Sequence, residues 1–231
     1  DATAVAVGHD GLIYTAGMTG TVDNNGDAYA ASNSSVDGSQ LNLWRLGQAD
    51  DTDFANAMAI DADNKLYLAG RTETDIDGDG TPRQGLSDAF LAKIDPSIEP
   101  EIDPEVDPST TDAVQWIEVI ASSGEDEAFG VAVDDFGNLY VSGGTNGDLS
   151  GQANAGGSDI FTARLTLDGN RNWLDLLGTG ADETGREVFL GDRGMVFVTG
   201  ATKGDLDVGI NNSLGSDDAF LVRYTSAGVL E

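Results

Sequence analysis

Residues 130–145 read GVAVDDFGNLYVSGGT and contain the pattern that decides the fold. A β-rich triplet, a polar turn and a second β-rich run lead to a glycine, with a threonine two places on. The same arrangement recurs without a gap in AVAVGHDGLIYTAGMT (4–19), AMAIDADNKLYLAGRT (57–72) and EVFLGDRGMVFVTGAT (187–202). Internal repeats of this length predict a repeat architecture, so each copy is expected to form the same pair of strands.

The copies share three marked positions and are followed by two further blocks. The glycines are Gly17, Gly70, Gly143 and Gly200, the aromatics three places earlier are Tyr14, Tyr67, Tyr140 and Phe197, and the threonines are Thr19, Thr72, Thr145 and Thr202. A second block opens with aspartate and alternates apolar with polar residues, in DAYAAS (27–32), DAFLAKI (88–94), DIFTARL (159–165) and DAFLVRY (218–224). A third block carries Trp44, Trp116 or Trp173 in the first three copies. Period-2 alternation indicates that both blocks are strands.

Each repeat is therefore expected to hold four strands, and the matched glycines stand 53, 73 and 57 residues apart. Four antiparallel strands repeated in tandem form β-propeller blades, whereas solenoid repeats, the alternative, are usually shorter. The sequence predicts an all-β chain that is a single β-propeller domain of four tandem four-stranded antiparallel blades. The repeats fall at about 1–49, 50–122, 123–179 and 180–231. Because the sequence stops at Glu231, the last blade is expected to lack its outer strand, and the four blades either close alone or belong to a larger ring.

An acidic, proline-rich insertion at residues 96–112 accounts for the longest spacing between glycines. Its centre, IEPEIDPEVDP (98–108), has a proline at every fourth residue. Proline cannot join a strand ladder and the like charges repel, so the sequence predicts an extended excursion. It is either a tolerated loop insertion or an arm that recognises a ligand or a neighbouring subunit.

The repeats resemble the bacterial SBBP β-propeller repeat family. That family reads roughly D-x-x-G-N-x-Y-V-x-G-x-T, then a glycine-rich stretch, then D-A-F-x-x-K and D-G-x-x-x-W. The match is clearest in DDFGNLYVSGGT (134–145), in DAFLAK (88–93) and in the Asp168-Gly169 turn before Trp173. The resemblance implies a propeller fold in an extracellular bacterial protein. The first copy departs most from the pattern, with His9 in its turn and a shortened loop.

The charge of the chain limits its partners. Forty-one acidic residues against 11 basic ones give a net charge of −30. This acidity argues against nucleic acid and anionic membrane partners, and favours bound cations or a saline medium. The sequence has no cysteine and no apolar run of the roughly 18 residues that a membrane span needs. We therefore expect an extracellular or cell-surface location on a bacterium.

The best candidate metal site is the sequence Asp75-Ile-Asp77-Gly-Asp79-Gly80. Alternating aspartates before a glycine open many calcium loops, because calcium prefers hard oxygen ligands and the glycine allows a tight turn. Asp75, Asp77 and Asp79 are the candidate calcium ligands, and Asp88 is a weaker one. No acid stands at the ninth or twelfth place, and aspartate recurs at the position of Asp75 in two later copies. A metal-free turn, in which aspartate bonds its own backbone, therefore stays open as an alternative.

Two sets of repeated residues have structural interpretations. We expect the aspartates that open the third strand to cap the preceding loop: Asp27, Asp88, Asp159 and Asp218. We expect the aromatics two places later to pack between blades, and to serve as sugar-stacking platforms only if exposed: Tyr29, Phe90, Phe161 and Phe220.

Catalytic residues are scarce, because His9 is the only histidine and lies in a turn. No nucleophile elbow, phosphate loop or zinc-protease motif is present. The leading interpretation is a non-catalytic extracellular module for adhesion, ligand binding or rigid scaffolding, with an unknown carbohydrate or protein ligand. The alternatives are a calcium-dependent propeller hydrolase or lyase, and an assembly module that closes its open blade on another chain. In the last case the partner is a second copy, giving a homo-oligomer, or further blades of a longer chain.

Overall fold

The computed structural model of the chain describes residues 1–20, 26–47, 52–77, 83–100, 112–206 and 217–231. The strands are β1 (Ala2–Val7), β2 (Ile13–Met18), β3 (Ala28–Asn33), β4 (Gln40–Leu46), β5 (Phe54–Ile60), β6 (Leu66–Thr72), β7 (Asp88–Ile94), β8 (Val114–Ile120), β9 (Asp126–Val133), β10 (Asn138–Thr145), β11 (Asp159–Thr166), β12 (Arg171–Leu177), β13 (Glu183–Leu190), β14 (Val196–Thr202) and β15 (Asp218–Tyr224). One 3₁₀ turn, η2 (Asp192–Gly194), is the only helical element in these ranges. None of the described residues forms a helix that is long and apolar enough to cross a membrane.

The strands form four separate antiparallel sheets, each made of strands that are consecutive in the chain. Sheet one is β1–β4, sheet two is β5–β8, sheet three is β9–β12 and sheet four is β13–β15. The predicted all-β class and the antiparallel pairing within each repeat are confirmed. After β15 the described chain adds an isolated bridge between Tyr224 and Leu230 and no fourth strand to sheet four. Residues 101–111 of the proline-rich insertion lie outside the described residues.

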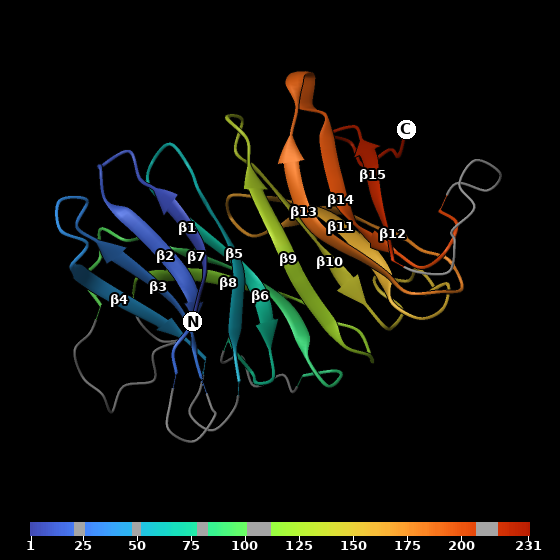
Figure 1. The fold of residues 1–231 in the computed structure, drawn as a ribbon, viewed down its shortest axis with the longest axis horizontal. Coiled ribbons are helices and arrows are strands. Elements are labelled where there is room, and N and C mark those ends of the chain that lie inside the picture. Colours follow the sequence, from blue (N-terminus) through green and yellow to red (C-terminus); the bar gives the residue numbers. More distant parts are fainter. Residues whose placement is uncertain (21–25, 48–51, 78–82, 101–111, 207–216) are drawn as a thin grey trace.

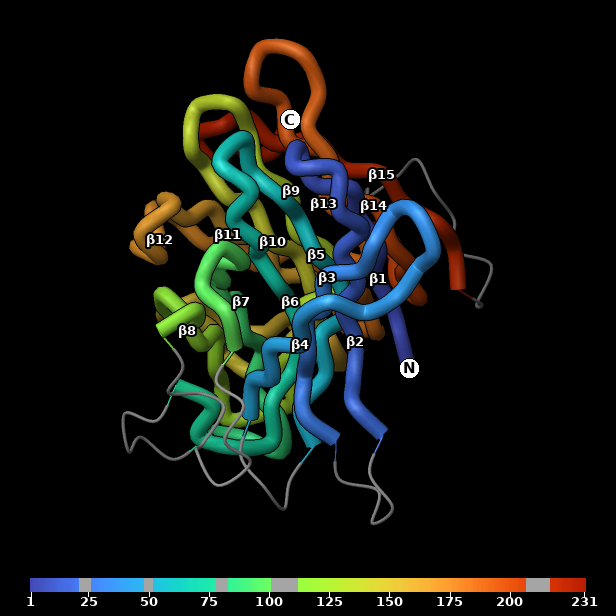
Figure 2. Tube along the Cα trace, turned by 90° about the vertical axis from the view of Figure 1, so that its left-hand side faces the viewer, coloured from blue at the N-terminus to red at the C-terminus, as the bar shows by residue number. Residues whose placement is uncertain are grey.

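The sheets fan out in chain order, from sheet one on the left of Figure 1 to sheet four on the right. Their first strands β1, β5, β9 and β13 lie next to one another in that order. Figure 2, turned by 90°, shows the outer strands β8 and β12 at the margin and β5 and β9 nearer the centre. Within the described ranges, the extensive contacts between sheets join one to two, two to three and three to four. The arrangement is therefore an arc of sheets that radiate from their inner strands.

The glycine of each repeat lies opposite a bulge in the inner strand. Gly17, Gly70, Gly143 and Gly200 each pair with the inner strand where its register shifts by one residue. A Cβ at any of these four positions would overlap a backbone carbonyl oxygen of that strand or, at Gly17, of Asp1 just before it. The close approach of two backbones, which a bulge produces, therefore explains why the repeat needs glycine here.

The bulge also directs one side chain of the inner strand to the next sheet. The Thr3 hydroxyl donates to a carbonyl of β5 at 2.5 Å, and the Asn56 amide donates to a carbonyl of β9 at 2.9 Å. At the third junction the guanidinium of Arg186 lies 4.7 Å from the centre of the Phe129 ring. A bulged residue therefore joins each pair of neighbouring inner strands.

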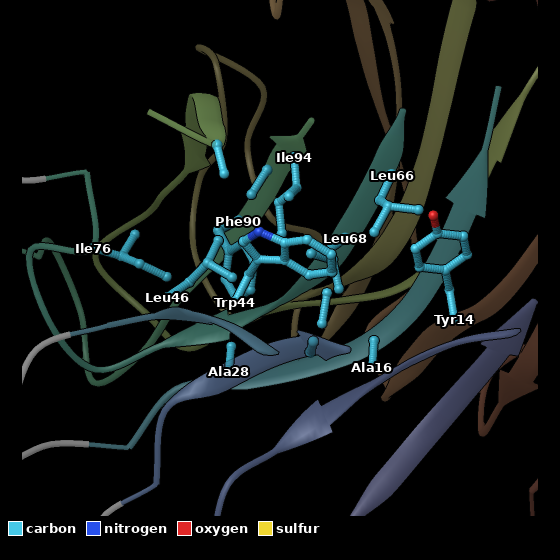
Figure 3. Packing of buried hydrophobic residues seen from close by; sticks show 14 residues of the cluster. Tyr14, Ala16, Ala28, Trp44, Leu46, Leu66, Leu68, Ile76, Phe90 and Ile94 are labelled. Atoms are coloured by element: carbon cyan, nitrogen blue, oxygen red, sulfur yellow. The ribbon is translucent and has the colours of Figure 1, made fainter. Parts of the chain in front are cut away.

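Three clusters of buried hydrophobic residues lie between the sheets, one at each junction. In the first cluster, Trp44 from sheet one lies beside Phe90 and Leu68 from sheet two, and all three are buried (Figure 3). Alternate residues of each strand face opposite neighbours, so one sheet contributes to two clusters. The described core is therefore divided among the junctions.

Each tryptophan of the outer strands connects its sheet to a turn of the next sheet. Trp44 Nε1 donates to the Ile98 carbonyl at 3.0 Å, Trp116 Nε1 to the Leu167 carbonyl at 3.0 Å, and Trp173 Nε1 to the Ser226 carbonyl at 3.1 Å. Lys93 and Arg164 donate to the second and third of these carbonyls, each at 3.1 Å. A tryptophan in the outer strand is thus a junction residue, which explains its recurrence in three copies.

The glycine of the receiving turn lies against the tryptophan ring. Gly169 and Gly228 have φ angles of 81° and 82°, which favour glycine. A Cβ at Gly169 would lie 3.0 Å from the Trp116 ring, and one at Gly228 would lie 2.7 Å from the Trp173 ring. Gly38, in the corresponding turn of sheet one, has a φ of 74° but no atom within 4 Å of its Cβ position.

Gly228→Ala and Gly38→Ala form a matched pair that isolates this contact. Both substitutions introduce left-handed strain, which we expect to lower the free energy of unfolding by about 1 kcal/mol. Gly228→Ala should lose about 1–3 kcal/mol more, because its methyl group overpacks against Trp173. Urea unfolding followed by tryptophan fluorescence measures both values. Equal losses for the two variants would contradict the packing of the turn under the tryptophan.

Candidate functional site

Buried carboxylates stand where the chain enters the inner strands of sheets two, three and four. These are Asp53, Asp126 and Glu183, and all three are fully buried. Asp126 accepts hydrogen bonds from the backbone N–H and the hydroxyl of Ser122 at 2.6 and 3.0 Å. Glu183 accepts the same pair from Thr179 at 2.5 and 2.8 Å. These acids therefore fasten the connection between sheets, which is a structural role.

Burial raises the pKa of two of these carboxyl groups. It raises the pKa of Asp53 to about 6, although a hydrogen bond from Thr72 opposes the rise. Burial also raises the pKa of Asp126, against an opposing hydrogen bond from Thr145. The repeated threonine thus favours the ionised carboxylate, which explains its place two residues after the glycine.

The aspartates that open the third strands cap the preceding loops. Asp88 Oδ2 accepts the backbone N–H of Gln84 at 3.1 Å, and Asp159 Oδ2 accepts that of Ala155 at 2.6 Å. The predicted capping role is confirmed for these two residues. Their Oδ1 atoms are buried and have no hydrogen-bond partner in the described part of the chain. Burial raises the pKa of both, and the charge of Glu183 adds to the rise at Asp159.

Three of the four predicted calcium ligands line one pocket of sheet two. Asp75, Asp77 and Asp88 surround a cavity of about 240 Å³ together with Arg83 and Glu118. Burial raises the pKa of Glu118, and the charge of Asp77 adds to the rise. No three His, Cys, Asp or Glu side chains among the described residues are placed to hold a metal ion. The fourth candidate, Asp79, lies outside those residues, so the calcium site stays a prediction.

His9 and the three repeated phenylalanines have the structural positions expected of them. His9 is exposed in a turn, where its backbone N–H donates to Asn64 Oδ1 at 2.7 Å. Phe90 and Phe161 are fully buried between sheets, and Phe220 is partly buried in the same way. None of these three phenylalanines is therefore an exposed platform for a sugar.

An exposed aromatic occurs instead in the turn between β9 and β10. Phe136 is 87% exposed, and the turn is shaped by Asp134, which accepts the backbone N–H groups of Phe136 and Asn138 at 2.9 and 2.8 Å. Since the turn is fixed by these bonds, the ring is held outside the core.

This turn borders a groove of about 810 Å³ between sheets three and four. We call it the turn groove, because the β9–β10 and β13–β14 turns form its two sides. Asp135 and Phe136 come from the first turn, Asp192 and Arg193 from the second, and Arg164 from β11. Both charge signs and an aromatic ring therefore surround one cavity large enough for a small ligand.

The sequence-based reasoning missed the turn groove and Glu118. Phe136 occupies a turn in which the other copies have no aromatic, and this was the available signal. Arg193 has a φ of 62°, a conformation that the sequence does not reveal. Glu118 is on β8, far in sequence from Asp75, and only the pairing of β7 with β8 brings it near.

Residues 115–150 match the SBBP family model, described as a beta-propeller repeat. This segment is similar to an SBBP-type repeat. The predicted resemblance is thereby confirmed over β8, β9 and β10. No curated protein matches the chain.

Solved structures show a similar fold. A protein of unknown function from Dyadobacter fermentans DSM 18053 has a TM-score of 0.50 and 11% identity, over 93% of this chain and 50% of that one. A thermostable family-43 glycoside hydrolase has a TM-score of 0.51 and 12% identity, over 98% of this chain and 72% of that one. The chain thus spans half the length of the first structure. Such low identities show the fold alone, which is propeller-like.

Asp53, at the junction of the first two repeats, should make stability depend on pH. Its folded pKa, about 6, lies above the ordinary 3.8, so its protonated form favours the folded state. This contribution is complete below about pH 4 and is lost as the pH rises through 6. We expect the wild type to lose up to about 3 kcal/mol of unfolding free energy across this window relative to Asp53→Asn.

Urea unfolding at several pH values between about 4 and 7 measures this difference. Asp37→Asn is the control, because hydrogen bonds from Ser39 lower the pKa of that exposed carboxyl and it titrates below the window. Parallel curves for the wild type and Asp53→Asn would show that Asp53 does not titrate as stated.

Proposed function

We propose that the chain is a non-catalytic β-propeller module that binds a carbohydrate or protein ligand outside a bacterial cell. The turn groove is the proposed site. The observation that carries this proposal is Phe136, an aromatic side chain 87% exposed beside Asp135 and Arg193 on the border of a large groove. Aromatic faces stack on apolar faces of sugars and peptides, while nearby charges orient their polar groups.

The roles of the buried polar residues support binding over catalysis. The carboxylate oxygens of Asp126 and Glu183 accept hydrogen bonds from Ser122 and Thr179, and Asp88 caps a loop. These groups hold the sheets together, so they are engaged in the fold. The likeness to a family-43 glycoside hydrolase shows the fold and supplies no catalytic residue for this chain.

The charge of the chain supports the proposed location and partners. A net charge of −30 repels nucleic acid and anionic membranes, and it suits a saline exterior with abundant cations. The match of residues 115–150 to the beta-propeller repeat model supports a propeller module. We accordingly propose an extracellular or cell-surface module that does not insert into the membrane.

Calcium is the proposed cofactor at the pocket of sheet two. The support is the shared lining of Asp75, Asp77, Asp88 and Glu118, since carboxylates are the ligands that calcium prefers. A cation there would also reduce the cost of burying Glu118 and Asp88 as charged groups.

A glycan and peptide array probed with the labelled chain tests the ligand proposal. We expect binding to at least one class of ligand, weakened about tenfold by Phe136→Ala through the loss of ring stacking. Leu86→Ala is the matched control, because Leu86 is also an exposed apolar residue but lies outside the groove, and it should bind as the wild type does. No binding, or equal binding by Phe136→Ala, would contradict the proposal. Release of soluble sugar would favour the hydrolase alternative.

Thermal melting in millimolar calcium and in EDTA tests the metal proposal. We expect calcium to raise the melting temperature, because a ligand that binds only the folded state stabilises it. Asp77→Asn should reduce this shift, whereas Asp63→Asn, in an exposed turn, should retain it. Identical melting in both buffers would overturn the metal proposal and leave the ligand proposal standing.

A further inference from the structure

Exposed hydrophobic side chains gather at the two ends of the arc. Eight of the ten large ones in the described residues belong to sheets one and four or to their turns. They are Val5, Val7, Val36 and Leu41 at one end, and Phe189, Leu221, Val229 and Leu230 at the other. The two inner sheets, covered on both sides, contribute one such residue each.

At sheet one, the exposed residues occupy positions that are covered in every other sheet. By strand register, Val5 and Val7 correspond to Met58 and Ile60 in sheet two, to Val131 and Val133 in sheet three, and to Val188 and Leu190 in sheet four. Those six residues pack against the preceding sheet. Val5 and Val7 are each 71% exposed. The outward face of sheet one is therefore built to receive a preceding sheet.

At sheet four, the complementary face is uncovered. Leu221 occupies the position of Leu91 in sheet two, which faces sheet three. Leu91 is 0% exposed and Leu221 is 61% exposed. Sheet four thus presents the face that sheet two buries against its successor.

The polar parts of the junction are also present at both ends. Arg223 corresponds to Lys93 and Arg164, which each donate to a turn carbonyl of the next sheet. Arg223 instead pairs with Glu231 at 3.1 Å, and both side chains are more than a third exposed. The receiving turn of sheet one, around Gly38, has nothing packed on its glycine. Sheet four therefore holds the hydrogen-bond donor, and sheet one holds the turn that is open to receive it.

We propose that a second copy of this chain covers these faces, with sheet four of one copy packed head-to-tail on sheet one of the other. The chain itself contains three junctions of this kind, so the contact continues an established interface. Donor and receiving faces are different surfaces at opposite ends of one arc, which makes the contact heterologous. Two copies form two such contacts and close a ring of eight sheets, within the four to eight blades usual in propellers.

Arg223 is the donor to the Gly38 turn, because the three tryptophans already occupy internal junctions. This assembly does not depend on the turn groove or on calcium.

Sedimentation of the 231-residue chain over a range of concentrations tests the assembly. Because each copy carries a charge of −30, it is done at moderate and at high sodium chloride. We expect a species of twice the monomer mass that is favoured by salt. Val7→Glu and Leu221→Glu should each abolish it, and Arg223→Ala should weaken it several-fold. Leu86→Glu, at an exposed apolar residue away from both ends, should leave it unchanged.

A mixture of Val7→Glu and Leu221→Glu chains tests the head-to-tail geometry. The first variant keeps an intact sheet-four face and the second keeps an intact sheet-one face, so together they form one native contact. We expect the mixture to reach dimer mass at concentrations where each variant alone is a monomer. Both residues are exposed in the single chain, and circular dichroism verifies that the variants fold.

Three outcomes would overturn the proposal. A wild-type chain that stays monomeric at all concentrations and salt levels would show that a second copy does not cover the end faces. Dimers that survive both substitutions would show that the contact lies elsewhere. A wild-type dimer whose two variants fail to associate in the mixture would show that the contact is not head-to-tail.

Discussion

The hydrogen bond from an outer-strand tryptophan to a turn of the next sheet is the contact on which the arrangement of sheets depends. The inner strands alone could act as a hinge, since they meet along one line. Trp116 adds a second point of attachment at the outer margin, through the Leu167 carbonyl and the surface of Gly169. Two separated attachments fix the angle between neighbouring sheets, and a cluster of buried hydrophobic residues packs between them.

The inner margin obeys a related constraint. A bulge in each inner strand brings its backbone so close to the second strand that only glycine fits, as at Gly70 and Gly143. The same bulge directs Asn56 across to the inner strand of the next sheet. The glycine and the bulge recur in all four sheets, and the bulged residue contacts the next inner strand through a hydrogen bond at the first two junctions and through the Arg186–Phe129 contact at the third.

How far the sequence predicts these features depends on how local they are. The repeated glycines and tryptophans indicate the strands and their order, because they recur at the same place in successive copies. The capping by Asp88 follows for the same reason, since its partner is four residues away. The turn groove does not follow, because Phe136 and Arg193 come from different sheets and meet only through the angle between them. Glu118 does not follow either, since the proline-rich insertion separates it in sequence from the aspartates of its pocket.

The buried acids show how an acidic chain can still form tight junctions. A charged carboxylate in a low-dielectric interior destabilises the fold unless hydrogen bonds compensate it, and the repeat supplies hydroxyl and N–H donors from Thr179 and Ser122. Compensation is incomplete at Asp53, whose pKa is raised to about 6, so the charged form of this junction is under electrostatic stress at neutral pH. The acids at these junctions therefore connect the sheets and, where burial raises their pKa, also oppose folding when they are ionised.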